Sequence, residues 1–264
     1  VLKKAKRIAA IVEVRMTSSR LPGKHLLKVL GKPILSYLID RLKTVESIDS
    51  IIIATTNNAT DDVLVKFAKQ NKIEVYRGDE YDVMGRVLDA AKYFKADIIC
   101  EVTGDCPIID PQLVEQVIQK YLCSNVDYIY NRSIKCLPDG MDVQVFSTSA
   151  LAQSEKQTNN PLDREHVTLH IKNHPELFSH VDIITPSSLY WPELGLTLDE
   201  IDDFKFLKKI IEYFNPENPL FSCYDVISLL KRNPELALIN QSVFRKGTLI
   251  WNPVEQKYEE VEEF

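Results

Sequence analysis

The sequence has few of the glycine and cysteine patterns that mark several common protein classes. Its eight glycines among 264 residues form neither G-x-x-x-x-G-K-[ST] nor G-x-G-x-x-G. The Walker phosphate loop and the fingerprint of dinucleotide-binding oxidoreductases are therefore both missing. The five cysteines are odd in number and include no C-x-x-C pair, which argues against a disulfide framework and against a zinc cage.

Long apolar runs and an excess of positive charge are missing as well. The apolar stretch at residues 8–14 is interrupted by Glu13 and is too short to cross a bilayer, and no signal-peptide cleavage pattern follows it. The net charge of −6 argues against a broad surface for nucleic acid. We therefore expect a cytoplasmic protein without membrane insertion and without a nucleic-acid partner.

Short apolar runs alternate with amphipathic segments over the first half of the chain. Apolar residues at helical spacing predict helices beginning near Leu35, Val83 and Leu113. Strands are expected at residues 7–14, 50–55, 73–76, 97–102 and 127–130. This alternation predicts an α/β fold with a Rossmann-like, doubly wound, mostly parallel sheet.

The rhythm changes after residue 130. A strand at 141–146, two helical stretches and a strand near 180–184 predict an inserted subdomain for substrate binding or dimerisation. Residues 194–198 are expected to return to the main sheet as a strand, and residues 248–251 and 257–261 to form a hairpin. The predicted division is a nucleotide-binding core at 1–130, an insertion at 131–193, a return to the core at 194–240 and an extension at 241–264.

Three fixed cations and three hydroxyls gather in the loop that follows the first expected strand. They are Arg15, Thr17, Ser18, Ser19, Arg20 and Lys24. Ligands of open parallel sheets bind beyond the carboxyl ends of the strands, and Leu21-Pro22-Gly23 predicts a turn just before Lys24. A solvated basic loop is the plain alternative, but this concentration of donors favours a polyphosphate site.

Two acidic groups are expected at the same edge of the sheet. Asp105 follows the strand at 97–102, and Asp199 follows residues 194–198. Beside a triphosphate such carboxylates suit Mg²⁺, a hard ion that takes oxygen ligands. Asp105 could instead cap a helix, although Asp110 before Pro111 is the better N-cap. Glu200, Asp202 and Asp203 suit the first turn of the following helix.

Six short motifs occur in an order and spacing typical of one protein family. They are VRMTSSRLPGK at 14–24, GKPI at 31–34, DVMGR at 82–86, TGDCP at 103–107, DGMDV at 139–143 and REHVT at 164–168. Together they resemble the cytidylyltransferase-like glycosyltransferase-A proteins over residues 7–215. Within that group they look like the SpsF-type proteins of spore-coat and surface-polysaccharide synthesis, which are related to the CMP-Kdo and CMP-acylneuraminate synthetases.

The resemblance implies a glycosyltransferase-A fold, a homodimer and a reaction. CTP would transfer CMP to an acidic or modified sugar with release of pyrophosphate, for surface-polysaccharide synthesis. Catalytic roles fall on Arg15, Lys24, Asp105 and Asp199, of which the two aspartates would hold Mg²⁺. The nucleotide-binding set is Arg15, Ser18, Ser19, Arg20, Lys24, Arg86, Thr103 and Gly104, and the acceptor-binding set is Asp142, Arg164, Glu165 and His166.

Several alternatives stay open from the sequence. Thr17 replaces the glycine usual in the SpsF-type loop and Glu13 replaces a glutamine or proline, so GTP is an alternative to CTP as the nucleotide. A sugar phosphate is an alternative to a sugar acid as the acceptor. A glycosyltransferase using a nucleotide sugar is less favoured, because Asp139-Gly140-Met141-Asp142 is not an Asp-x-Asp motif. A catalytically silent nucleotide-binding subunit is a further alternative. His166 is either a base that helps the acceptor hydroxyl or a histidine on a helix face bonded to Glu165.

Overall fold

The computed structural model describes residues 6–132, 136–245 and 248–261. Its centre is a seven-stranded sheet in the order β5-β4-β1-β6-β8-β7-β9. The strands are β1 (Ile8–Glu13), β4 (Ser50–Thr56), β5 (Glu74–Gly78), β6 (Ile98–Thr103), β7 (Tyr128–Tyr130), β8 (Gln144–Ser147) and β9 (His180–Asp182). Only β8 pairs antiparallel with its neighbours, so the predicted α/β fold with a mostly parallel sheet is confirmed.

Both faces of the sheet are covered by helices, which is why its central strands are apolar on both sides. Ala10 and Val12 of β1 pack in one cluster with helices α1, α2 and α4, whereas Ala9 and Ile11 pack in a second cluster with α3, α5 and α7. The helices are α1 (Leu35–Leu42), α2 (Asp62–Asn71), α3 (Val83–Tyr93), α4 (Pro111–Leu122), α5 (Thr148–Gln157), α6 (Pro161–Glu165) and α7 (Leu169–Asn173).

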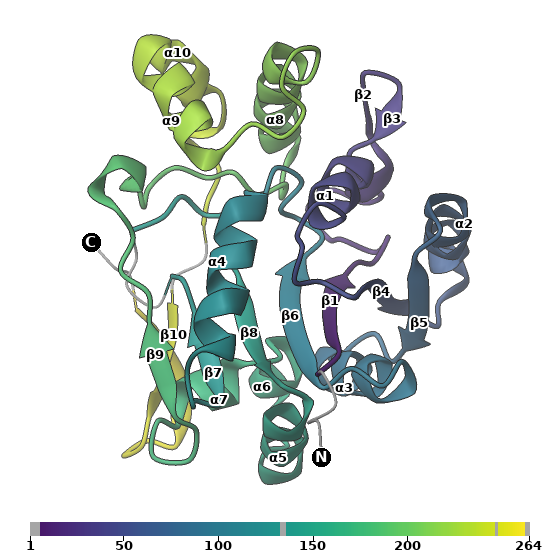
Figure 1. The fold of residues 1–264 in the computed structure, drawn as a ribbon, viewed down its shortest axis with the longest axis vertical. Helices are drawn as coiled ribbons and strands as arrows, with labels where there is room; N and C mark the ends of the chain where they lie inside the picture. The colour runs from purple at the N-terminus through teal and green to yellow at the C-terminus, as the bar shows by residue number, and fades with distance from the viewer. Residues whose placement is uncertain (1–5, 133–135, 246–247, 262–264) are drawn as a thin grey trace.

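Two helices, α8 (Ile201–Phe214) and α9 (Cys223–Arg232), lie beyond the carboxyl ends of β1 and β6 (Figure 1), and their apolar residues belong to a third cluster. This cluster joins α8 and α9 to the short hairpin of β2 (Lys28–Val29) and β3 (Lys32–Pro33). The short helix α10 (Pro234–Ala237) follows α9. Within the described part of the chain, no helix is both long and apolar enough to cross a membrane.

The end of the chain forms the predicted hairpin. Strands β10 (Thr248–Asn252) and β11 (Lys257–Val261) pair with each other and not with the main sheet. The backbone N–H of Trp251 donates to the Asn173 side chain at 3.0 Å, so the hairpin lies against α7. The C-terminal extension is therefore folded onto the part of the chain for which acceptor binding is predicted.

Two expected strands differ from the structure. Residues 194–198 are not a strand of the main sheet: Gly195 makes an isolated bridge with Asp139, and the N–H of Leu198 donates to the Asp105 carbonyl at 2.8 Å. Their apolar side chains pack against α8 and α9 instead. The strand expected at 141–146 begins only at Gln144. Before it, the Asn131 side chain donates to the Met141 carbonyl and accepts from the Val143 N–H, so these backbone groups bond a side chain and not a strand.

Candidate nucleotide site

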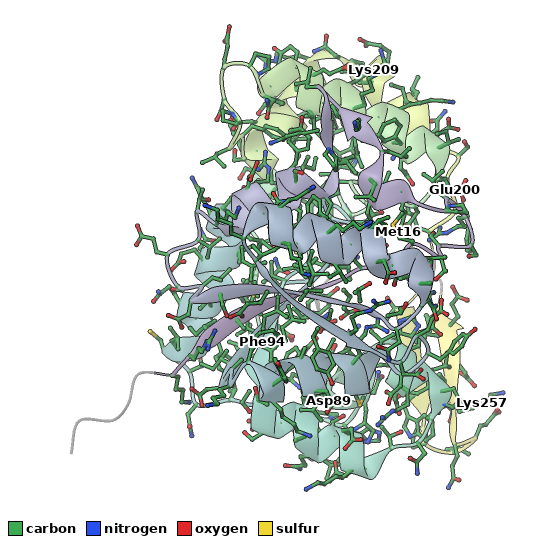
Figure 2. The ribbon with its side chains drawn as sticks, turned by 90° about the vertical axis from the view of Figure 1, so that its right-hand side faces the viewer. Met16, Asp89, Phe94, Glu200, Lys209 and Lys257 are labelled. Carbon is green, nitrogen blue, oxygen red and sulfur yellow. The ribbon has the colours of Figure 1, made fainter. Side chains whose placement is uncertain are left out.

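The loop at residues 15–24 follows β1 and is closed by its own backbone. The N–H of Gly23 donates to the Met16 carbonyl at 3.1 Å, and the N–H of Lys24 donates to the Leu21 carbonyl at 3.3 Å. The second bond confirms the turn predicted before Lys24. In Figure 2, Met16 of this loop and Glu200, next to Asp199, lie on the same side of the molecule.

A buried carboxylate anchors the start of this loop. Asp61 accepts a hydrogen bond from the Met16 N–H at 2.9 Å and further bonds from Thr55 and Thr56 at the end of β4. Burial alone would raise the pKa of Asp61, but these hydrogen bonds outweigh burial and lower the pKa. Asp61 is thus a charged support beneath the predicted phosphate loop.

Lys24 lies between the two predicted metal ligands. Its Nζ is 2.7 Å from Asp105 Oδ1 and 3.3 Å from Asp199 Oδ1, and its side chain is only 6% exposed. The two carboxylates therefore converge on one nearly buried cation, although they lie 94 positions apart in the sequence. The structure thus brings together two carboxylates and a loop cation that are all expected at the carboxyl edge of the sheet, and their metal-binding and phosphate-binding roles stay predictions.

Two arginines complete the surroundings of Asp199. Arg20 Nη2 is 2.7 Å from Asp199 Oδ1, so the loop supplies a second cation beside Lys24. Arg245, from the segment before the C-terminal hairpin, approaches Asp199 Oδ2 at 3.5 Å. Nucleotide binding by Arg20 stays a prediction, and Arg245 was not among the residues predicted from the sequence.

Close packing fixes the position of Asp105. The N–H of Gly104 donates to the Glu13 carbonyl at 2.9 Å, and a Cβ at residue 104 would lie 2.9 Å from that same oxygen and 2.8 Å from Val14 Cγ2. Only glycine lets β6 end so close to β1. His25 Nε2 is 3.6 Å from Asp105 Oδ1, and burial lowers the pKa of His25, so a neutral imidazole lies beside this carboxylate.

The remaining nucleotide-binding residues are arranged around the same edge. Arg15 pairs with Glu80 at 3.6 Å, and the Thr17 hydroxyl donates to the same carboxylate at 2.5 Å. Arg86 is buried, and its guanidinium donates to the carbonyls of residues 79 and 80. Ser18 is half-buried, whereas Ser19 and Thr103 are exposed.

Glu13, which departs from the family pattern, faces another acid. Glu13 of β1 and Glu101 of β6 form a hydrogen-bonded pair, and Glu101 is only 4% exposed. Two carboxyl groups can bond in this way only if they share a proton. Burial and the nearby charge of Glu13 raise the pKa of Glu101 well above its usual range.

The predicted acceptor residues divide into two places. Asp142 accepts hydrogen bonds from Tyr130 at 2.9 Å and from Arg132 at 3.3 Å. Arg132 also bonds Asp139 at 3.0 Å. Burial and the charge of Asp142 raise the pKa of Asp139 to about 6. Asp139 is linked through the Thr197 hydroxyl to Asp199, so this acidic group adjoins the metal-ligand pair.

The second place is helix α6. Arg164 forms ion pairs with Asp82, which caps α3, and with Glu155 of α5, so its guanidinium joins three helices. Glu165 and His166 are exposed at the end of α6. Acceptor binding by Asp142, Arg164, Glu165 and His166 stays a prediction.

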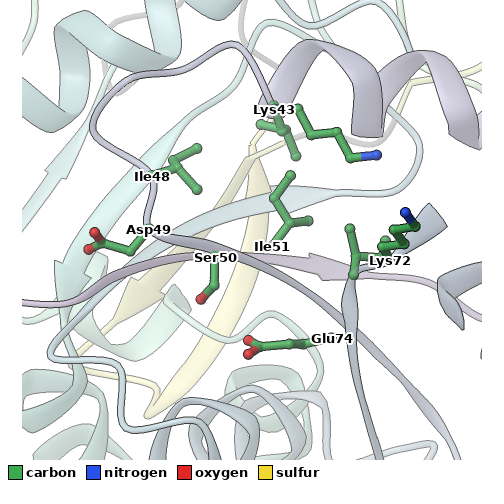
Figure 3. Close-up of a pocket in the computed structure, with 9 residues that line it drawn as sticks. Lys43, Ile48, Asp49, Ser50, Ile51, Lys72 and Glu74 are labelled. Carbon is green, nitrogen blue, oxygen red and sulfur yellow. The ribbon is translucent and has the colours of Figure 1, made fainter.

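A separate cleft of about 370 Å³ lies at the other end of the sheet (Figure 3). It is lined by residues at the amino ends of β4 and β5, among them Asp49, Ser50 and Glu74. Two of its charged groups have partners within the chain: Glu74 Oε1 pairs with Arg7 at 3.2 Å, and Lys43 donates to the Asn71 carbonyl at 3.1 Å. None of the predicted site residues lines this cleft.

The donor set at Asp105 and Asp199 fits a divalent cation bound together with a phosphate. Among the residues that the structure describes, no three His, Cys, Asp or Glu side chains form a group able to hold a metal alone. Two carboxylates that already converge on the Lys24 ammonium do suit Mg²⁺, which commonly takes one or two carboxylates and completes its shell with water and phosphate oxygens.

Asp61, His25, Glu80 and Arg245 are parts of this site that the sequence reasoning missed. Asp61 follows a strand at the same sheet edge, so the rule that led to Asp105 could have found it. Arg245 has no comparable signal, since it belongs to no strand, helix or recognisable motif.

A doubly wound sheet with a cation-rich loop facing two carboxylates at its carboxyl edge defines a nucleotidyltransferase of the glycosyltransferase-A type. The comparisons with known proteins agree, since the cytidylyltransferase family matches residues 9–221. The chain belongs to the cytidylyltransferase family.

Three relatives illustrate the similarity. An uncharacterized protein of Methanocaldococcus jannaschii is 33% identical over 97% of this chain and all of its own length. The spore coat polysaccharide biosynthesis protein SpsF of Bacillus subtilis is 32% identical over 87% of this chain and 96% of its own. A solved cytidylyltransferase from Leptospira borgpetersenii matches with a TM-score of 0.85 and 30% identity, covering 91% of this chain and all of that one.

Proposed function

We propose that this cytidylyltransferase activates a sugar acid or a related modified sugar as its CMP derivative, with Mg²⁺ as the metal, for surface-polysaccharide synthesis. The convergence of Asp105 and Asp199 on the Lys24 ammonium, at 2.7 and 3.3 Å, carries the proposal. The similarity to SpsF, which is named for polysaccharide synthesis, supports the choice of a sugar acceptor.

The reaction asks little covalent chemistry of the protein. An acceptor hydroxyl attacks the α-phosphate of CTP, the new P–O bond forms as the bond to the β-phosphate oxygen breaks, and pyrophosphate leaves. Lys24, Arg20 and Arg15 neutralise the phosphates and orient them for attack. Held by Asp105 and Asp199, Mg²⁺ would supply charge stabilisation at the phosphates.

The proposal extends to location and assembly. CTP is made and used in the cytoplasm, so we place the reaction there. We also propose a homodimer formed through residues 131–193, which sedimentation equilibrium of the purified protein can test. A monomer at micromolar concentration would contradict this assembly.

Direct binding measurements test the nucleotide first. Calorimetric titration with CTP, GTP, UTP and ATP, each with Mg²⁺, should give the tightest binding for CTP. Pyrophosphate release is then measured with CTP and a panel of octulosonic and nonulosonic acids, together with sugar phosphates. Preference for GTP, or turnover only with a phosphorylated acceptor, would contradict the proposed substrates.

Two variants test the assigned residues. Asp105→Asn should abolish Mg²⁺-dependent turnover without unfolding the protein, and Lys24→Ala should weaken CTP binding by about 1.5 to 3 kcal/mol, the usual value of hydrogen bonds to charged groups. Asp202→Asn, at a half-buried position, and Lys28→Ala, at an exposed one, make the same changes nearby and serve as controls. Normal pyrophosphate release by Asp105→Asn, or unchanged CTP affinity in Lys24→Ala, would refute the corresponding role.

A further inference from the structure

Arg245 reaches the Asp199 loop from outside the region that matches the family. The family match ends at residue 221, yet the Arg245 guanidinium donates to the Thr197 hydroxyl at 2.9 Å and approaches Asp199 Oδ2 at 3.5 Å. Because Arg20 and Lys24 are directed at Oδ1, the two oxygens of Asp199 have separate cationic partners.

Arg245 also acts on Asp199 through a second carboxylate. Asp203 is fully buried, and its Oδ2 accepts hydrogen bonds from the backbone N–H groups of Asp199 and Glu200 at 3.0 and 2.9 Å. Arg245 Nη2 is 2.6 Å from Asp203 Oδ1. The guanidinium thus neutralises the buried group that holds the Asp199 backbone in place.

The fold provides a fitted surface for this guanidinium. A Cβ built on Gly195 would lie 2.1 Å from Arg245 Nη2, 2.4 Å from Cζ and 2.5 Å from Nε. Such distances are far inside van der Waals contact, so any side chain at residue 195 would displace the guanidinium. The contact with Gly195 and the ion pair with Asp203 are independent signs that Arg245 has one defined place.

We propose that Arg245 is a positioning residue for Asp199, and that the segment after α10 thereby completes the metal and nucleotide site. The inference rests on the proposed function, since it takes Asp199 as the ligand that binds Mg²⁺ together with CTP. With the guanidinium absent, Asp199 and Asp203 repel each other, and neither the Oδ2 atom nor the backbone of Asp199 is held.

If Arg245 had a purely structural role, its loss would have the same effect on the site as the loss of Asn240. The Asn240 side chain donates to Asp203 Oδ1 at 2.8 Å and to the Gly195 carbonyl at 3.0 Å, with no bond to Asp199. Loss of Asn240 therefore weakens the same buried region without removing the cation beside Asp199. A structural role predicts equal effects of the two losses on the site.

The experiment measures CTP binding to the full chain by calorimetry, once with Mg²⁺ and once with EDTA. Arg245→Met removes the guanidinium, and Gly195→Ala displaces it while keeping its charge. Asn240→Ala controls for lost packing, and Arg232→Met, at an exposed position on α9, controls for lost charge. The melting temperature of every variant is recorded without ligand.

We expect the factor by which Mg²⁺ lowers the Kd of CTP to be at least tenfold smaller in Arg245→Met and Gly195→Ala than in the wild type. Both controls should keep the wild-type factor. If all four variants keep the wild-type effect of Mg²⁺, or if Asn240→Ala loses as much of it as Arg245→Met, the inference is wrong. A wild-type protein that binds no CTP under either condition would contradict the proposed function itself, and the inference with it.

Discussion

At the scale of single residues, Asp61 is the side chain on which the phosphate loop depends. Asp61→Asn replaces one acceptor oxygen by an NH₂ group in a fully buried site where four hydrogen bonds converge. We expect a loss of unfolding free energy of roughly 1.5 to 3 kcal/mol and weaker CTP binding, because the start of the loop at Met16 loses its support. Urea unfolding and calorimetry measure the two effects.

The neighbouring Asp62 offers a matched control, since its pair with Arg77 is exposed and exposed pairs contribute about 0 to 1 kcal/mol. The pH dependence adds a second check. Because the folded pKa of Asp61 is lowered, its stabilisation is complete above the unfolded pKa and is lost as the pH falls through the folded value. An Asp61→Asn protein with wild-type stability at pH 7 would contradict this role.

The acid pair at Glu13 and Glu101 predicts the opposite dependence of stability on pH. The folded pKa of Glu101 is raised, so its contribution is complete below the unfolded pKa and declines as the pH rises toward the folded value. Glu101→Gln keeps a donor for Glu13 and removes the ionisable group. The variant should therefore gain melting temperature over the wild type as the pH rises from 4.5 to 8.

Exposed Glu235 provides the control for this prediction. Glu235→Gln makes the same change in charge at a solvated position and should keep a nearly constant difference from the wild type across the pH range. If the gain of Glu101→Gln is independent of pH, the two acids do not share a proton in the folded protein.

At the scale of helices and strands, one aspartate joins two helix starts. Asp110 Oδ1 accepts the N–H of Gln112 in the first turn of α4, as the sequence predicted, and Oδ2 accepts the N–H of Cys223 at the start of α9. Since a lost N-cap costs about 0.5 to 2 kcal/mol, Asp110→Ala should cost about 2 kcal/mol or more. Asn160 caps α6 alone, so Asn160→Ala should cost less, and equal losses in urea unfolding would contradict the double role.

The sequence predicted elements well where burial alone decides them. The helices at Leu35, Val83 and Leu113 and the parallel strands have an apolar period that their packing requires. Residues 194–198 misled this reasoning because they are apolar and buried without joining the sheet. An apolar run predicts that a segment is buried, whereas its pairing as a strand depends on whether another strand lies next to it.

The same limit applies to the site. Arg20, Lys24, Asp105 and Asp199 could be predicted because each follows an expected strand at the edge where ligands bind. Asp61 also follows a strand at that edge and could have been found by the same rule. Arg245 acts on Asp199 across 46 positions of sequence, and its residue type carries no sign of that contact. No site residue was predicted in the C-terminal segment, yet Arg245 of that segment contacts Asp199 in the folded protein.

At the scale of the whole molecule, the C-terminal hairpin should be the part that opens most easily. An isolated two-stranded hairpin is marginally stable in water, and β10 and β11 pair only with each other. Their attachment depends on Asn173 of α7 and on the Tyr258 hydroxyl, which donates to the buried carboxylate of Asp163 in α6. Burial raises the pKa of Tyr258, so this hydroxyl keeps its proton.

Tyr258→Phe removes that hydrogen bond and leaves Asp163 with the Thr158 hydroxyl as its remaining side-chain donor among the described residues. We expect faster hydrogen exchange across 248–261 with unchanged protection in β1, β4 and β6, because the main sheet shares no strand pairing with the hairpin. Tyr224→Phe, at an exposed ring on α9, is the control. If β1 and the hairpin lose protection together, the hairpin and the sheet unfold as one cooperative unit, and the C-terminal segment cannot open without the nucleotide site opening too.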